Sequence, residues 1–214
     1  MELVHVERAK SVNYFDQVNR IYIDSFPDSQ IRPNEMLRQM LGTDPNYHLF
    51  IARHQDSLVG FSLLYTFSEL GVGLLDFMAI DREHRGQNIG SNLFRYTLER
   101  CWMLINNCLG VVLEVQRESS LYRDRDNIRR KRIIFYRRLG AKIFDGVHYL
   151  LPNLHGGKLE DMYLMMVPRQ DLQFVLKEFV FCVIKAVYRT FYDTYETNQM
   201  GPVMADLPSK IKLI

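Results

Sequence analysis

The sequence LDFMAIDREHRGQNIGS, residues 75–91, joins an apolar strand pattern to a helix pattern. The apolar run ends at Ile80, a short polar loop follows, and helical spacing of apolar residues begins near Asn88. A loop that enters a helix N-terminus presents several backbone N–H groups in one direction, and the helix dipole places positive charge there. Gly86 and Gly90 let a ligand approach this backbone closely. The stretch therefore indicates a phosphate site, with an ordinary glycine-containing turn as the alternative.

Outside this stretch, the chain alternates between strand and helix patterns. We expect strands at residues 3–6, 47–53, 58–67, 74–80, 111–115, 141–151 and 160–167. We expect helices at residues 12–25, 34–41, 127–139 and 171–195, besides the one that begins near residue 88, and an irregular tail from residue 198. The sequence has no internal repeat, low-complexity tract or linker, which favours one α/β domain.

Composition and charge indicate a globular protein of the cytoplasm. Hydrophobic residues make up 47% of the 214 residues, which is enough to form the core of one domain. Lys and Arg total 27 against 25 for Asp and Glu, and this near balance does not favour a dedicated nucleic-acid binder. The three cysteines have neither disulfide nor zinc spacing, which favours a reducing compartment. The N-terminal sequence MELVHVERAK lacks a secretory pattern, and charged residues interrupt the apolar run 174–192, so we expect no membrane span.

Two motifs in order give the sequence a family resemblance. Residues 85–90, RGQNIG, preceded by Met78-Ala79-Ile80, resemble the acyl-CoA signature of the GNAT N-acetyltransferase superfamily, which is Arg or Gln, any, any, Gly, any, Gly or Ala. Residues 135–141, FYRRLGA, resemble the second signature of that superfamily. The resemblance covers about residues 1–167 and implies a mixed α/β (α+β) fold, in which helices flank a mostly antiparallel central sheet. Residues 168–214 would then form a C-terminal helical extension packed on the same domain.

The resemblance implies that the chain binds acetyl-CoA as its cosubstrate. The strand end would pair with the pantetheine arm as an added strand, and the loop N–H groups would hold the pyrophosphate. The residues implied for coenzyme binding are Met78, Ala79, Ile80, Arg85, Gly86, Gln87, Asn88, Ile89, Gly90, Ser91 and Arg132. Asn88 stands where the family has glycine, and asparagine tolerates the left-handed backbone conformation better than most residues.

The segment 117–138 is strongly basic, with nine Lys and Arg residues against three acids. It has three interpretations: a clamp for the 3′-phosphate of coenzyme A through Arg129 or Arg132, a nucleic-acid surface, or a solvated helix face. These two arginines stand where the family often has Asn and Ala. The absence of aromatic residues between Arg123 and Arg132 argues against stacking on single-stranded nucleic acid.

Acyl transfer to an amine requires an acceptor for the amine proton and a donor for the departing thiolate. Tyr136 matches the tyrosine that family members often place beside the coenzyme sulfur, where it protonates the thiolate. Glu114 and Asp76 each interrupt an apolar strand, and burial beside a cleft would raise the pKa of such a carboxyl group. Contact with solvent or with an arginine is the alternative for either carboxylate. By analogy with the family, Phe26 and Tyr149 would border the acceptor pocket.

These features favour an enzyme, an acyl-CoA-dependent N-acyltransferase. The expected reaction moves an acetyl group from acetyl-CoA to a primary amine of a small molecule or peptide. Direct attack in a ternary complex is expected, because neither motif contains a cysteine that would hold the acyl group. A longer-chain N-acyltransferase of the acyl amino acid synthase type and a catalytically silent CoA-binding module are the alternatives. The histidine spacing predicts no metal site, and the aromatic last helix is expected to dock on the core, with a homodimer contact or a lid as alternatives.

Overall fold

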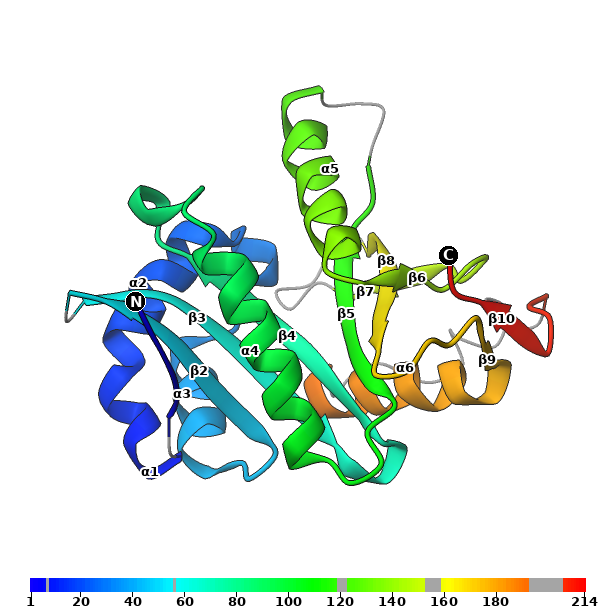
Figure 1. The fold of residues 1–214 in the computed structure, drawn as a ribbon, viewed down its shortest axis with the longest axis horizontal. Helices are drawn as coiled ribbons and strands as arrows, with labels where there is room; N and C mark the ends of the chain where they lie inside the picture. Colours follow the sequence, from blue (N-terminus) through cyan, green and yellow to red (C-terminus); the bar gives the residue numbers. More distant parts are fainter. Residues whose placement is uncertain (7, 56, 119–122, 153–158, 193–205) are drawn as a thin grey trace. The chain divides into compact units, whose positions relative to one another are not determined.

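The computed structural model describes residues 1–6, 8–55, 57–118, 123–152, 159–192 and 206–214. It confirms the expected mixed α/β class, in which helices flank mostly antiparallel strands (Figure 1). The chain forms two compact units, Met1–Cys108 and Leu109–Ile214, and each has its own strands and buried residues. The domain boundary at residue 167 that the resemblance implies stays a prediction.

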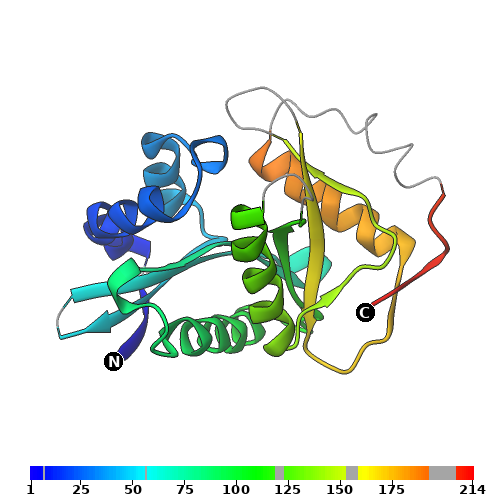
Figure 2. The ribbon, with the colours of Figure 1, turned by 90° about the horizontal axis from the view of Figure 1, so that it is seen from above.

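The first unit contains four strands that pair antiparallel in chain order. They are β1 (Glu2–Val6), β2 (Tyr47–His54), β3 (Ser57–Phe67) and β4 (Val72–Ile80). Its helices are α1 (Arg8–Ser11), α2 (Phe15–Ser25), α3 (Asn34–Thr43) and α4 (Ile89–Leu104), with short 3-10 turns η1 (Val12–Tyr14), η2 (Asp28–Gln30), η3 (Ser68–Leu70) and η4 (Arg82–His84). Figure 2 shows α2 and α3 on one side of β2 and β3, and α4 on the other side. Because both faces of β3 are covered, residues 58–64 are buried without interruption.

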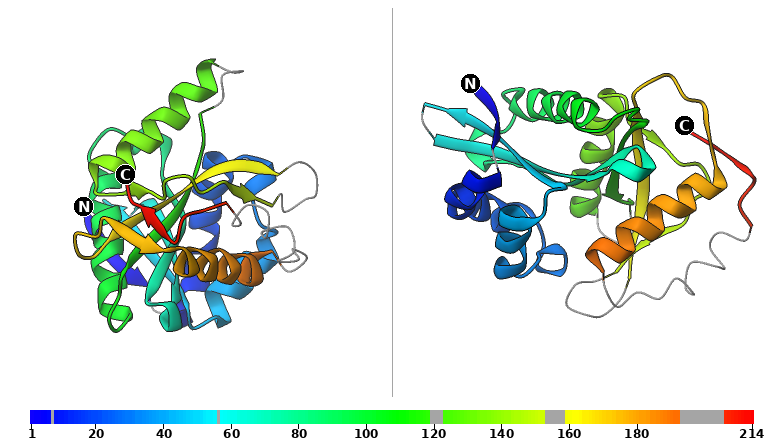
Figure 3. Two further views of the ribbon diagram at one scale, coloured as in Figure 1. Left: turned by 90° about the vertical axis from the view of Figure 1, so that its right-hand side faces the viewer. Right: turned by 90° about the horizontal axis from the view of Figure 1, so that it is seen from below.

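The second unit is centred on β8 (Glu160–Pro168), which pairs antiparallel with three other strands. These are β5 (Gly110–Gln116), β6 (Lys142–Ile143) and β7 (Tyr149–Leu151). Helices α5 (Arg123–Arg138) and α6 (Lys177–Phe191) lie on opposite sides of β5 and β8 (Figure 3). One side of α6 is apolar and buried, and it consists of Val180, Val183, Ile184, Val187, Tyr188 and Phe191.

A turn interrupts the strand expected at residues 141–151, so that prediction is wrong in its length. The turn lies at Asp145 and Gly146, and Gly146 adopts a positive φ of 74°. The Val147 N–H donates to the Phe144 carbonyl oxygen at 3.3 Å, which closes the turn. The segments before and after it, β6 and β7, both pair with β8 but in different registers, because the turn residues loop out between them.

The helix expected at residues 171–195 begins only at Lys177, and the expected irregular tail contains a strand. Residues Phe174–Leu176 form β9, which pairs antiparallel with β10 (Lys210–Lys212). Ile211 in β10 is fully buried, so the pairing also adds to the core of the second unit. Local periodicity does not reveal this strand pair, because β9 and β10 are distant from each other in the sequence. Residues 193–205 lie outside the described residues.

The three cysteines differ in exposure and are all free thiols. Cys101 on α4 and Cys108 beyond its end are buried, with their sulfur atoms 3.9 Å apart, whereas Cys182 on α6 is exposed. The hydrogen bond with Cys108, followed by burial, raises the pKa of the Cys101 thiol. The Cys101 thiol therefore stays protonated, and both buried sulfurs serve as core material.

Candidate active site

Asp81 organises the chain reversal that follows β4. Its N–H extends the β3–β4 ladder by donating to the Val59 carbonyl oxygen at 2.8 Å. Its side chain caps η4 by accepting a hydrogen bond from the Glu83 N–H at 3.1 Å. Its carbonyl oxygen accepts from the His84 N–H at 2.9 Å. The backbone and side chain of Asp81 thus fix both the end of the strand and the turn after it.

Two residues with positive φ lead the chain from η4 into α4. Gly86 has a φ of 79°, and a Cβ atom there would meet no atom within 4 Å, so conformation rather than crowding favours glycine. Asn88, the N-cap of α4, has a φ of 65° and a ψ of 0°, in the left-handed region. Asparagine is one of the few residues besides glycine that adopt this region at low cost. The asparagine at the motif's glycine position therefore fits the loop conformation.

The first turn of α4 presents backbone N–H groups without helical acceptors. Asn92 is the residue that begins the helical ladder, because its N–H donates to the Asn88 carbonyl oxygen at 3.1 Å. No hydrogen bond joins the preceding N–H groups of Ile89, Gly90 and Ser91 to another described residue. The first turn carries no acidic side chain, and α4 is 16 residues long. These donors and the positive end of the helix dipole can therefore bind an anion.

The end of β4 directs two backbone positions away from β3. Asp81 and Val59 form a hydrogen-bonded pair of the β3–β4 ladder. Because bonded and non-bonded pairs alternate in an antiparallel ladder, the N–H and C=O groups of Ile80 and Met78 point away from β3. Those of Ala79 point towards β3 and belong to the ladder. Met78 and Ile80 thus have the backbone direction that strand addition by a pantetheine arm requires.

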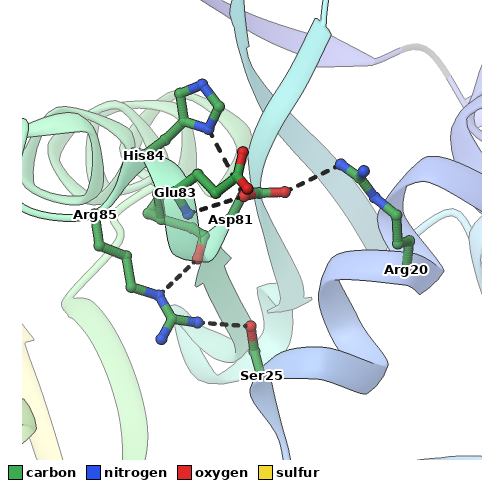
Figure 4. Close-up of polar contacts among 7 residues, drawn as sticks. Arg20, Ser25, Asp81, Glu83, His84 and Arg85 are labelled. Carbon is green, nitrogen blue, oxygen red and sulfur yellow. Dashed lines mark hydrogen bonds and ion pairs between the residues drawn. The ribbon is translucent and has the colours of Figure 1, made fainter.

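Two side chains of α2 contact this reversal, as Figure 4 shows. Arg85 folds back along the loop, where its Nε donates to the Ile80 carbonyl oxygen at 2.9 Å and its Nη2 donates to the Ser25 hydroxyl at 3.2 Å. Arg20 forms an ion pair with Asp81 at 3.0 Å from Nη2 to Oδ2. Sequence patterns did not point to Arg20 or Ser25, because both are polar residues of an ordinary amphipathic helix.

Asp76, one of the two expected proton acceptors, lies in a buried ion pair. Arg32 donates to both carboxylate oxygens, from Nη1 at 2.5 Å and from Nη2 at 2.8 Å, and the Tyr47 hydroxyl donates at 2.5 Å. The side chains of Arg32 and Asp76 are only 2% and 3% exposed. Both oxygens of Asp76 are thus engaged by a buried guanidinium, and separating such a pair is costly. Burial, followed by the Asp76 charge, raises the pKa of Tyr47 well above its ordinary value, so Tyr47 remains a donor.

Phe26, expected beside the acceptor, packs against β4. Its ring lies edge-on to Phe77 with centroids 4.9 Å apart, and Tyr22 contacts the same ring at 4.7 Å. The Arg32 guanidinium carbon lies 4.9 Å from the centre of the Phe77 ring. The segment between α2 and α3 is thus anchored on the residue that immediately precedes Met78 in β4.

In the second unit, Glu114 and Tyr149 share one face of the sheet. Glu114 lies opposite Leu164, and Tyr149 lies opposite Met162, two positions earlier in β8. The Tyr149 hydroxyl donates a hydrogen bond to Glu114 Oε1. Burial, followed by the charge of Glu114, raises the pKa of Tyr149 well above its ordinary value. Tyr149 therefore keeps its proton and remains a donor to the carboxylate.

Tyr136 lies on α5 and is 8% exposed. Burial raises the pKa of Tyr136 to about 12, and the charge of Arg132 opposes the rise. The hydroxyl is therefore protonated throughout the neutral range. Since an ordinary thiol has a pKa of about 8.5, full proton transfer from this tyrosine to a thiolate is uphill, whereas hydrogen-bond donation is not.

The basic segment divides into structural and exposed residues. Arg117, which follows β5, contacts Asp161 of β8 at 3.1 Å and donates to the Val147 carbonyl oxygen, before β7, at 2.8 Å. Arg132 is half-buried on α5, one turn before Tyr136. The exposed members are Arg130, Lys131, Arg137 and Arg138.

Two features are absent from the described part of the chain. Within it, no group of three or more His, Cys, Asp or Glu side chains is arranged to hold a metal ion. No helix there has the length and apolar character needed to cross a membrane.

The family comparison identifies a domain within the chain. Residues 45–140 match the model of the GNAT acetyltransferase domain. The matched range includes the whole reversal from β4 into α4 as well as Tyr136, and it confirms the resemblance seen in the sequence. Among curated proteins, none matches this sequence.

Solved structures share the fold at low sequence identity. A Bacteroides thetaiotaomicron protein described as a GNAT-family acetyltransferase is 21% identical with a TM-score of 0.69, and the match covers 92% of this chain and 100% of that one. The ribosomal-protein-S18-alanine N-acetyltransferase of Escherichia coli is 15% identical with a TM-score of 0.56, covering 80% and 95%. An aminoglycoside 6′-N-acetyltransferase complexed with coenzyme A is 21% identical with a TM-score of 0.55, covering 80% and 100%.

The left-handed conformation of Asn88 predicts how substitutions affect stability. Asn88→Gly should change the free energy of unfolding by less than about 0.5 kcal/mol, whereas Asn88→Val should lower it by about 1–2 kcal/mol, because a β-branched side chain is strained there. Urea unfolding measures both values, with Gln87→Val at the exposed preceding residue as the control. Equal stability of the glycine and valine variants would contradict the assigned conformation.

The raised pKa of Tyr136 predicts a loss of stability in alkali. Tyrosine in the unfolded chain ionises near pH 10, whereas Tyr136 in the folded protein ionises near pH 12, so its contribution is complete below pH 10 and declines above it. The free energy of unfolding at pH 11 should therefore be about 1.4 kcal/mol lower than at pH 8 because of this residue alone. Urea unfolding at the two pH values should therefore show a smaller loss for Tyr136→Phe than for the wild type. Identical losses would count against the burial of this hydroxyl.

Proposed function

Because residues 45–140 match the model of the GNAT acetyltransferase domain, we propose that the protein is an N-acetyltransferase that moves an acetyl group from acetyl-CoA to a primary amine. The observation that carries the proposal is the reversal from β4 into α4, where N–H groups of the first helical turn have no partner among the described residues. A pyrophosphate supplies the acceptors that these donors lack. The proposed donor is acetyl-CoA rather than a longer acyl-CoA.

The first unit supplies the coenzyme contacts in this proposal. The backbone of Met78 and Ile80 would pair with the pantetheine amides, and the N–H groups of Ile89, Gly90 and Ser91 would bind the pyrophosphate oxygens. The other residues of the first unit proposed for this site are Ala79, Arg85, Gly86, Gln87 and Asn88. Arg132, on α5 of the second unit, is also proposed to bind the coenzyme. Gly86 carries no side chain to obstruct the approach, and the space around its Cα is open.

The second unit supplies the proposed acid–base groups. Glu114 would accept the proton that the attacking amine loses, directly or through water. The Tyr149 hydroxyl would orient the carboxylate by its hydrogen bond to Oε1. Tyr136 would donate a hydrogen bond to the departing sulfur, with water completing the proton transfer. We favour Glu114 over Asp76 because Arg32 already occupies both oxygens of Asp76.

The acceptor is proposed to be an amine of a small molecule or a peptide, bordered by Phe26 and Tyr149. Two of the similar structures are named for acceptors of these two classes. One is named for an aminoglycoside, which is a small molecule, and the other for an alanine of a ribosomal protein. Both acceptors present a primary amine, and direct attack on the thioester requires that amine in its neutral form.

Acetyl-CoA should bind the purified protein, and an amine acceptor should release free coenzyme A from it. Calorimetry measures the first event, and a thiol-reactive dye measures the second across a panel of aminoglycosides, polyamines and peptides with free N-termini. Acetyl-, octanoyl- and palmitoyl-CoA provide the chain-length comparison. Faster turnover with the long donors would contradict the acetyl donor, and binding without thiol release from any acceptor would favour a silent coenzyme-binding module. No binding of any of these donors would overturn the proposal.

Substitution at the two proposed acid–base groups should affect turnover rather than coenzyme binding. Glu114→Gln should lower kcat by about 100-fold and Tyr136→Phe by about tenfold or more, with the Kd for acetyl-CoA within about twofold of wild type. Tyr163→Phe, on the other face of β8, is the matched control and should retain kcat. Unchanged turnover in Glu114→Gln would point to Asp76 or to solvent as the proton acceptor, and unchanged turnover in Tyr136→Phe would remove this tyrosine from the reaction.

A further inference from the structure

Helix α2 contacts the coenzyme loop at two separate points. Arg20 forms the ion pair with Asp81 at 3.0 Å, and Ser25 accepts the hydrogen bond from Arg85 at 3.2 Å (Figure 4). These contacts join residues that are 61 and 60 positions apart in the sequence. Because the loop itself is short and exposed, contacts from a packed helix can restrict its conformations before any ligand binds.

The Arg20 contact offsets the negative charge of Asp81 at the start of the loop. Asp81 is needed to cap η4, yet its carboxylate lies at the entrance of a loop proposed to bind two phosphates. An unpaired carboxylate there would repel the ligand. Arg20 places a guanidinium against Oδ2, and His84 lies on the other side with Nδ1 3.7 Å from Oδ1. The ion pair therefore offsets the charge of the capping residue while leaving its capping oxygen in use.

The Ser25 contact fixes the side chain of Arg85. The Arg85 Nε donates to the Ile80 carbonyl oxygen and its Nη2 donates to the Ser25 hydroxyl. Arg85 therefore bridges the end of β4 and the end of α2. In this position Arg85 holds the loop in place through its side chain. The backbone N–H groups after it remain directed by Gly86 and Asn88, which carry the two positive φ angles.

We propose that Arg20 and Ser25 are positioning residues for the coenzyme, acting through Asp81 and Arg85 respectively. They hold the loop in the conformation that accepts the pyrophosphate and make no contact with the reacting thioester. This inference rests on the proposed function, because it requires that the loop binds the pyrophosphate of acetyl-CoA. It predicts that changes on α2 weaken binding of the pyrophosphate part of the ligand only.

The test measures the Kd of two ligands by calorimetry: acetyl-CoA and S-acetylpantetheine, which lacks the pyrophosphate. Ser25→Ala should weaken acetyl-CoA binding about fivefold and Arg20→Ala about threefold, as expected for an exposed charged hydrogen bond and an exposed ion pair. Neither variant should alter binding of S-acetylpantetheine. Ser25→Thr, which keeps the hydroxyl, should restore the wild-type Kd for acetyl-CoA. Arg38→Ala is the matched control. Arg38 forms a comparable exposed ion pair, 3.2 Å from Nη2 to Asp16 Oδ1, and this pair does not involve the loop.

A double-mutant cycle between Ser25→Ala and Arg85→Ala tests whether the serine acts through the arginine. The two losses of acetyl-CoA affinity should be non-additive, with the double variant close to Arg85→Ala alone. Additive losses would overturn the proposal for Ser25 and make Arg85 a direct phosphate ligand. Wild-type Kd values in both Ser25→Ala and Arg20→Ala would overturn it entirely, as would equal weakening of both ligands. Failure of the wild type itself to bind acetyl-CoA would instead overturn the proposed function.

Discussion

The structure depends most on a single backbone constraint, the turn from β4 into α4, which leaves the first helical N–H groups without acceptors among the described residues. Unsatisfied donors of this kind are tolerated at an exposed helix start, where water or a ligand can accept from them. The turn itself is costly, because two residues must adopt positive φ. Gly86 and Asn88 meet that requirement, and Asp81 supplies the hydrogen bonds that the turn needs.

Asp76 and Glu114 both lie in apolar strands, but their carboxylates have different hydrogen-bond partners. Asp76 has a fully buried arginine on both oxygens, so its charge is fixed by an ion pair that would be expensive to break. Glu114 accepts a hydrogen bond from a neutral donor, the hydroxyl of Tyr149. A neutral hydrogen bond orients a carboxylate and still permits proton uptake. The partners, rather than the strand positions, therefore separate the ion-paired Asp76 from Glu114, the proposed proton acceptor.

Much of the fold could be predicted from the sequence, because strong local patterns produce it. The apolar runs of β2, β3, β4, β5 and β8 and the reversal at Gly86 each carry their own signal. The pair β9–β10 could not be predicted, since its stability comes from a partner distant in the sequence and from the burial of Ile211. The interruption of the strand at Gly146 was equally hidden, because a glycine in a strand pattern indicates a bulge as readily as a turn.

The candidate site follows the same division. The loop residues were recognisable because their backbone requirements restrict the amino-acid types that fit. Arg32 and Ser25 were not, because each acts through a partner that only the fold brings near it. For Arg32 the only signal was an acidic residue in an apolar strand, Asp76, which implies a cation somewhere in the chain without indicating which one. Burial then selects Arg32, whose side chain is 2% exposed.

The unequal exposure of the cysteines has a practical consequence for studying this protein. Cys101 and Cys108 are enclosed in the first unit, so a maleimide reagent applied to the native protein should reach only Cys182 on α6. A fluorophore or spin label can thus be attached at one position without removing any native residue. Such a probe sits on the outer side of a helix in the second unit, where it can report on that unit during ligand titrations.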